Sequence, residues 1–311
     1  MFLPAGSYRS KEAALVLRRL AARELIELAV APPTNEQLIL EVFVKQDQVS
    51  PTAANRRNFL KGAGLTGLGI ATTAIVGLPA ALTTSKVEAA AYSDVDILNF
   101  ALNLEYLEAE FYAVSTYGST LLKLGVISAD DQTGPTTGGG RVPNFSSSPL
   151  ANVATALRTD EIDHVIYLRS ALGSAAAKKP AINLNALGYG YSSVSSWLKL
   201  ARQFEDVGVS AYLGAAPLIS SSAYLAAAAA ILSAEAMHSG AIRWECIGNA
   251  VNSPAVDSLD IPPTSKAVFD LNSKALAIAR TPSQVLNIVY AGGRSSGGFY
   301  PNGMNGGITT Q

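Results

Sequence analysis

The sequence predicts an all-α protein built on a four-helix bundle, with a long crossover and extra C-terminal helices. Apolar side chains make up 49% of the 311 residues, which is enough for a large core. In four segments they recur at steps of three and four residues, the period of an amphipathic helix. These segments are residues 94–117, 150–178, 192–216 and 221–248. Each segment also carries a glutamate inside its apolar stripe, and this shared feature links the four helices.

The first 91 residues are expected to be an N-terminal extension followed by a targeting signal, and not part of the fold. Residues 55–61 read NRRNFLK and precede an uncharged stretch, 62–85, which the small residues 89–91 follow. Charged, apolar and small segments in this order are typical of a secretory signal. Arg56 and Arg57, with the Phe-Leu-Lys that follows, resemble the bacterial twin-arginine signal.

This resemblance implies that residues 55–91 are a signal peptide and that the twin-arginine export machinery is a partner. The protein would then be periplasmic or extracellular. The alternative is an uncleaved membrane anchor, because the apolar run is long enough to span a bilayer. Residues 1–54 are interpreted either as an extension of unknown role or as the result of a misplaced start.

Composition excludes several classes of protein. The 23 basic and 24 acidic side chains nearly cancel, so no nucleic-acid partner is expected. The single cysteine, Cys246, rules out an internal disulfide framework, a cysteine-based zinc site and an iron–sulfur cluster. We expect Cys246 to be a small, buried apolar side chain.

The first and third helices repeat each other. Glu105 and Tyr112 match Glu205 and Tyr212 at a constant offset of 100 residues, and in both helices the residues share one face. A carboxylate in an apolar stripe is unfavourable unless it is paired, protonated or bound to metal. The two tyrosines are candidates to hydrogen-bond these carboxylates or to carry radicals, although a core tyrosine with a satisfied hydroxyl is the favoured role.

The second and fourth helices carry Glu-x-x-His pairs. Glu161 and His164 match Glu235 and His238 at a constant offset of 74 residues. Residues three apart on a helix point to the same side, so each pair offers a carboxylate and an imidazole to one point. With the two single glutamates, the bundle supplies the ligand set of a di-iron or di-manganese carboxylate site. We expect two metal ions, with iron favoured.

The chain is similar to the ferritin-like superfamily, and within it to ferritin-like domain proteins related to plant desiccation-related proteins. Residues 94–112 (DVDILNFALNLEYLEAEFY) are similar to the opening helix of that group. Residues 281–290, near the C-terminus, also resemble the group. The likeness covers about residues 93–290. It implies a ferritin-like bundle over residues 92–250 and a C-terminal helical extension with a Gly-rich tail over 251–311. The superfamily motif implies six metal ligands: Glu105, Glu161, His164, Glu205, Glu235 and His238.

Residues beside these ligands are assigned less directly. Glu108 lies one turn from Glu105 and is either an extra ligand or a solvated flank. Asp160 lies one turn before His164 and either orients the ring of His164 or is an exposed aspartate. Glu110 lies on a different side of the helix from Glu105 and is expected at the surface.

The connections set the remaining expectations. Residues 118–149 form a long link rich in Gly, Ser, Thr and Pro, where cage-forming ferritins have a short turn, so an iron-storage cage is not expected. Residues 175–191 are the crossover between the second and third helices. Two further helices are predicted, around residues 266–278 and at 282–290.

Two functional hypotheses follow. The first is an exported di-metal redox protein that consumes peroxide or oxidises ferrous iron during oxidative or desiccation stress, with a small oxidant or a metal ion as its partner. The second is a non-enzymatic protective or interaction bundle whose metal site is structural or vestigial. A homo-oligomer is compatible with either hypothesis.

Overall fold

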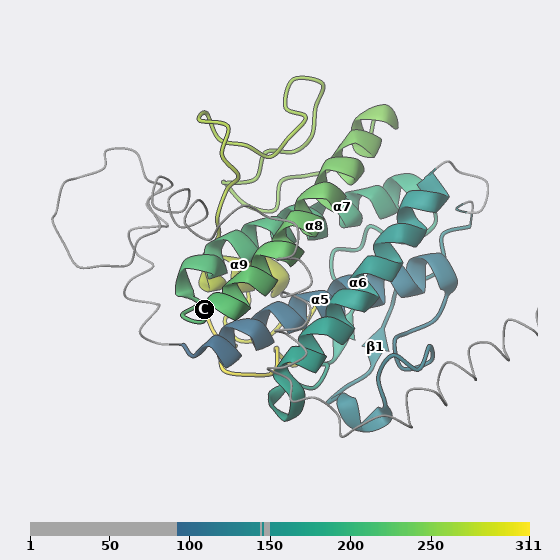
Figure 1. Ribbon diagram of the computed structural model, residues 1–311. Helices are drawn as coiled ribbons and strands as arrows, with labels where there is room; N and C mark the ends of the chain where they lie inside the picture. The colour runs from purple at the N-terminus through teal and green to yellow at the C-terminus, as the bar shows by residue number, and fades with distance from the viewer. Residues whose placement is uncertain (1–91, 144, 146–149) are drawn as a thin grey trace, which may run out of the picture. The chain divides into compact units, whose positions relative to one another are not determined.

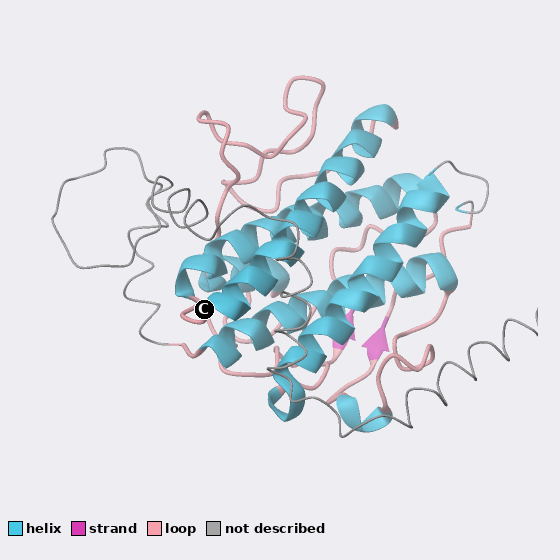
Figure 2. Cartoon of the chain, in the orientation of Figure 1, coloured by secondary structure: helices cyan, strands magenta, loops and turns pink. Residues whose placement is uncertain are grey.

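The computed structural model describes residues 92–143, 145 and 150–311, and the described part of the chain is mostly helical (Figures 1 and 2). Four long helices form a bundle: α5 (Asp94–Tyr117), α6 (Leu150–Leu172), α7 (Val194–Ala215) and α8 (Ser222–Gly248). A shorter helix, α9 (Pro282–Val289), follows near the C-terminus. The predicted all-α bundle is therefore confirmed. The predicted signal, with Arg56 and Arg57, lies outside the described residues, as does the 1–54 extension.

The helices pack in two main pairs, α5 with α6 and α7 with α8, and α5 also packs against α7. Helix α5 lies at the centre, because every one of its residues from Ile97 to Ser115 is buried. The C-terminal tail covers its remaining side, where the Tyr300 hydroxyl donates to the Asn103 carbonyl over 2.6 Å. This enclosure explains why α5 has no polar face and only a weak amphipathic pattern.

Local signals in the sequence explain where the helices begin and end. Ser93 caps α5 and forms a reciprocal capping box with Asp96. Gly118 ends α5 in the left-handed conformation, with φ of 75°. Ser193 and Ser221 cap α7 and α8 by accepting backbone N–H groups of the first turn. Helix α8 is long and apolar enough to cross a membrane, but it packs against α7 as a bundle helix.

The long link between α5 and α6 lies against α5 and corrects one prediction. Its strand β1 (Thr136–Thr137) pairs in parallel with β2 (Ile182–Asn183) of the crossover. Glu110, which we expected at the surface, is fully buried under this link. The Glu110 carboxylate accepts the backbone N–H of Leu121 and lies 3.8 Å from the Nζ atom of buried Lys179. Helical position alone misplaced Glu110, because distant segments cover this side of α5.

The C-terminal extension contains one of the two predicted helices. Helix α9 matches the prediction closely, but residues 266–278 form turns with two isolated bridges. Asn272 organises one turn by accepting the backbone N–H of Lys274 and of Leu276. Arg243 of α8 donates to backbone carbonyls of this segment, including that of Val268 over 2.7 Å. The helix prediction was wrong because carbonyls of this segment accept from an arginine of the bundle rather than from backbone N–H groups one helical turn further along.

Two helix glycines provide a matched stability test. A Cβ atom on Gly214 would lie 1.8 Å from the Arg280 carbonyl oxygen, whereas a Cβ atom on Gly240 would meet nothing within 4 Å. We expect Gly214→Ala to lower the free energy of unfolding by about 1–3 kcal/mol, because the backbones must move apart. Gly240→Ala should raise it by up to about 1 kcal/mol through helix propensity. Thermal and urea unfolding measure both, and a stabilising Gly214→Ala would contradict this close approach.

Candidate metal centre

Six polar side chains meet between the four long helices. Helix α5 contributes Glu105, α7 contributes Glu205, and α6 and α8 each contribute a glutamate and a histidine one turn apart. The four glutamates have no exposed surface, and both histidines are largely buried. The structure thus brings together all six predicted ligands: Glu105, Glu161, His164, Glu205, Glu235 and His238.

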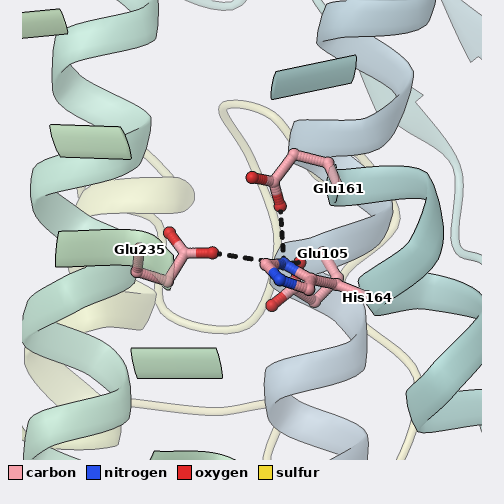
Figure 3. A group of neighbouring side chains, drawn as sticks. All are labelled: Glu105, Glu161, His164 and Glu235. Carbon is pink, nitrogen blue, oxygen red and sulfur yellow. Dashed lines mark hydrogen bonds and ion pairs between the residues drawn. The ribbon is translucent and has the colours of Figure 1, made fainter. Parts of the chain in front are cut away.

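His164 is the centre of the first half of the cluster. Its Nδ1 atom lies 3.2 Å from Glu105 Oε2, 3.2 Å from Glu161 Oε2 and 3.4 Å from Glu235 Oε1. Figure 3 shows these carboxylates approaching the ring from three helices. One imidazole nitrogen and three carboxylate oxygens therefore face a common point.

His238 is the centre of the second half. Its Nδ1 atom lies 2.8 Å from Glu161 Oε1 and 3.5 Å from Glu205 Oε2. The two groups of ligand atoms share Glu161 and Glu235, and within each group the atoms lie within 4.8 Å of one another. The arrangement offers two adjacent cation positions, each with its own glutamate and histidine and with two carboxylates in common.

Unsatisfied polar atoms show that this donor set fits metal ions. Buried oxygens of Glu161, Glu205 and Glu235 and the Nδ1 atom of His238 have only the ion-pair contacts given above, and no well-formed hydrogen bond within the described residues. Buried carboxylates without donors are strongly unfavourable unless a cation or a proton balances them. Carboxylate oxygens and imidazole nitrogens are the ligands that iron and manganese take in such bundles.

The crowding of like charges shifts the ionisation of the cluster. Burial, together with the negative charge of Glu161, raises the pKa of Glu235 well above its usual value. Burial and the negative charge of Glu105 raise the pKa of Glu161 to about 7. Burial alone would lower the pKa of His238, but its interactions with Glu161 and Glu205 outweigh this and raise it to about 11. Without metal the cluster therefore retains protons, which a cation would displace.

Two tyrosines brace the cluster crosswise. The Tyr112 hydroxyl of α5 donates to Glu205 Oε1 of α7, and the Tyr212 hydroxyl of α7 donates to Glu105 Oε1 of α5. Both tyrosines are buried, with satisfied hydroxyls. Because each takes the Oε1 atom, the Oε2 atoms of Glu105 and Glu205 are left facing His164 and His238.

Asp160 contacts His238, whereas the sequence predicted a contact with His164. The structure places its carboxylate 3.2 Å from Nε2 of His238, with half of the Asp160 side chain exposed. His238 reaches it from α8 across the seam with α6, and this contact leaves Nδ1 facing the ligands. Asp160 thus orients a ring, as one of our interpretations required, but the ring is that of His238 rather than His164.

Glu108 and Gly208 adjoin the cluster without joining either ligand group. Glu108 is buried, so a solvated flank is wrong, and burial and the charge of Glu235 raise its pKa well above the usual value. A Cβ atom on Gly208 would lie 2.6 Å from Glu235 Oε2 and 3.2 Å from Glu108 Oε1. Gly208 was not among the predicted site residues, although a glycine in a helix interior three residues after Glu205 was a signal.

Comparisons with known proteins agree with the helical bundle. A family model described as a ferritin-like domain matches residues 93–246, which contain all six candidate ligands. The chain is also similar to the ferritin-like catalase Nec2 of Nesocodon mauritianus. The two are 26% identical over 275 residues, covering 70% of this chain and 85% of the relative.

Metal binding should stabilise the folded domain. A cation that binds the folded cluster and barely binds the unfolded chain raises the melting temperature with the logarithm of its free concentration. We expect Mn²⁺, or Fe²⁺ under anaerobic conditions, to raise it by several degrees at ~100 times the Kd. Glu161→Ala and His238→Ala should remove most of this gain. Glu245→Gln on α8, away from the cluster, should not.

Metal-free protein should lose stability as the pH rises. The pKa of Glu161 is about 7 in the folded state, and that of His238 is about 11, both above the values expected in the unfolded chain. Between about pH 5 and 9 the folded state therefore binds more protons, and its free energy of unfolding falls by a few kcal/mol. Urea unfolding in the presence of a chelator tests this. A flat or rising profile over that range would contradict the ionisation described here.

Proposed function

Because residues 93–246 make this chain a member of the ferritin-like superfamily, we propose that it is a di-metal oxidoreductase that consumes hydrogen peroxide. The observation that carries the proposal is the pair of overlapping ligand groups sharing Glu161 and Glu235. Such a pair would hold two cations, whereas a purely structural site needs only one ligand group. The relative named as a ferritin-like catalase supports peroxide as the substrate.

The ligands named above would hold the two ions, and bound iron or manganese would supply the reversible change of oxidation state that the reaction needs. The protein's own groups manage the protons. Reduction of one peroxide to water consumes two protons and two electrons, and oxidation of the next peroxide to dioxygen releases them. The Glu108 carboxyl, whose pKa is well above its usual value, holds a proton beside Glu235.

The exposed edges of the cluster favour a small substrate. The glutamates are fully enclosed, while the side chains of His164 and His238 retain 13% and 9% exposure. Half-exposed Asp160 lies beside His238 on the same side. Peroxide would thus reach the cluster along the histidine edge, between α6 and α8. Closed packing elsewhere excludes larger substrates.

The proposal is tested by measuring metal content and dioxygen release on the same purified full-length protein. We expect metal-loaded protein to release dioxygen from hydrogen peroxide, and Glu235→Gln to lower the rate by ~100-fold or more, because a shared ligand is lost. Glu245→Gln makes the same chemical change on the same helix and should retain the rate. If metal-loaded protein releases no dioxygen but oxidises ferrous iron, then ferrous iron rather than peroxide is the substrate. Inactivity in both assays would favour a protective bundle.

We further propose that the chain is exported by the twin-arginine machinery and acts in oxidative or desiccation stress. The support is the sequence NRRNFLK at residues 55–61, followed by an uncharged stretch. Replacement of Arg56 and Arg57 by lysine together should retain the protein in the cytoplasm, because the signal is recognised through both arginines. Cell fractionation and immunoblotting measure this. Unchanged export of the double variant would point to another route or to a simple anchor.

A further inference from the structure

A cavity lies between the outer side of helices α7 and α8 and the C-terminal extension. Its volume is about 240 Å³, and none of the six candidate ligands lines it. Polar groups of Asp206, Ser239, Arg243 and Asp270 converge on it, and Phe269 and Leu271 contribute apolar walls. A partly open pocket with a mainly apolar lining and a few converging polar groups is typical of a small-molecule site. The volume is ample for one aromatic ring with a short substituent, since a dry cavity of about 150 Å³ binds benzene.

The charges around this cavity do not balance. Each of the three arginines in the region is paired with one aspartate, at distances from 2.6 to 2.8 Å between nitrogen and oxygen. The pairs are Arg202 with Asp260, Arg243 with Asp206, and Arg280 with Asp257. Among the described residues, a fourth aspartate, Asp270, lines the cavity without an arginine ion pair. These four aspartates and three arginines together carry one more negative charge than positive charge.

Asp270 is the residue that this excess charge identifies. Its Oδ1 atom is buried and has no hydrogen-bond partner within the described part of the chain. Burial and the negative charge of Asp206 raise the pKa of Asp270 to about 6, so the carboxylate is ionised at pH 7.5. A buried acceptor without a donor is unfavourable, and a cationic donor would relieve it.

The remaining donors and acceptors decide which kind of cation fits. Asp206 already accepts from Ser239 and from Arg243, each over 2.6 Å. Asp260 already accepts from Arg202 and from the backbone N–H of Val256. Oxygens of Asp206, Asp260 and Asp270 lie within 4.8 Å of one another, but a divalent cation would have to displace these donors. An ammonium group needs only Asp270, with Ser239 Oγ as a second acceptor.

We propose that this cavity binds a small organic ammonium ion, with the ammonium group on the Asp270 carboxylate and its apolar body against Phe269 and Leu271. The charge-assisted hydrogen bond provides selectivity for an amine over a neutral molecule of the same shape. The apolar walls provide selectivity for a hydrocarbon body over a hydrated metal ion. The inference does not depend on the metal centre, because no candidate ligand lines the cavity.

Calorimetric titration of the full-length protein with benzylamine tests the proposal. We expect benzylamine to bind at least ~10-fold more tightly than benzyl alcohol, which has the same ring without the charge. Asp270→Asn keeps the shape of the side chain and should weaken benzylamine binding by ~10-fold or more. Asp130→Asn, an exposed aspartate elsewhere, should leave binding unchanged.

A second variant tests the location without touching any charge. A Cβ atom on Gly240, which lines the cavity, meets no atom within 4 Å, so Gly240→Leu should fill the space without distorting α8. This variant should abolish benzylamine binding, whereas Gly248→Leu, also unobstructed but outside the cavity, should retain it. Equal binding of the amine and the alcohol, no binding of either, or Ca²⁺ binding that is lost in Asp270→Asn would overturn the proposal.

Discussion

The structure depends on an excess of negative charge at the centre of the bundle. Four glutamates without exposed surface face two histidines, so even doubly protonated imidazoles leave negative charge uncompensated. Glu161 lies at the middle of this cluster, because both histidine Nδ1 atoms approach its carboxylate. Only bound cations or retained protons can balance such a group in a medium of low dielectric. The same helices that bury the cluster place the carboxylate and imidazole atoms of each ligand group within 4.8 Å of one another, where a cation could balance them.

Interactions among protein groups establish that geometry. The crossed bonds of Tyr112 and Tyr212 orient the carboxylates of Glu205 and Glu105, and Asp160 orients His238 from the opposite side. Gly208 lets α7 approach Glu235 closely. Ligands held by partners of their own are arranged before a cation arrives, which lowers the reorganisation that binding requires. The repeat of a glutamate and a tyrosine seven residues apart in α5 and α7 makes the bracing reciprocal.

The C-terminal extension has two structural roles beyond the bundle. Its tail completes the enclosure of α5, as the contact between Tyr300 and Asn103 shows. Its turn-rich segment is held to α7 and α8 by Arg202, Arg243 and Arg280, which are buried and fully engaged. This second role leaves Asp270 at a cavity that the four-helix bundle alone would not form. The outer face of α7 and α8 thus carries a cavity separate from the six-residue cluster between the helices.

The sequence alone determined the four helices, the six candidate ligands and their order, because helical spacing is local and places residues three or four apart on one face. The burial of Cys246 and the helix at 282–290 followed from equally local patterns. Tertiary structure decided the rest: Glu110 is buried by a link from elsewhere in the chain, Asp160 meets the histidine of another helix, and residues 266–278 are held as turns by Arg243. These outcomes depend on contacts between segments far apart in the sequence, which periodicity along one helix does not encode.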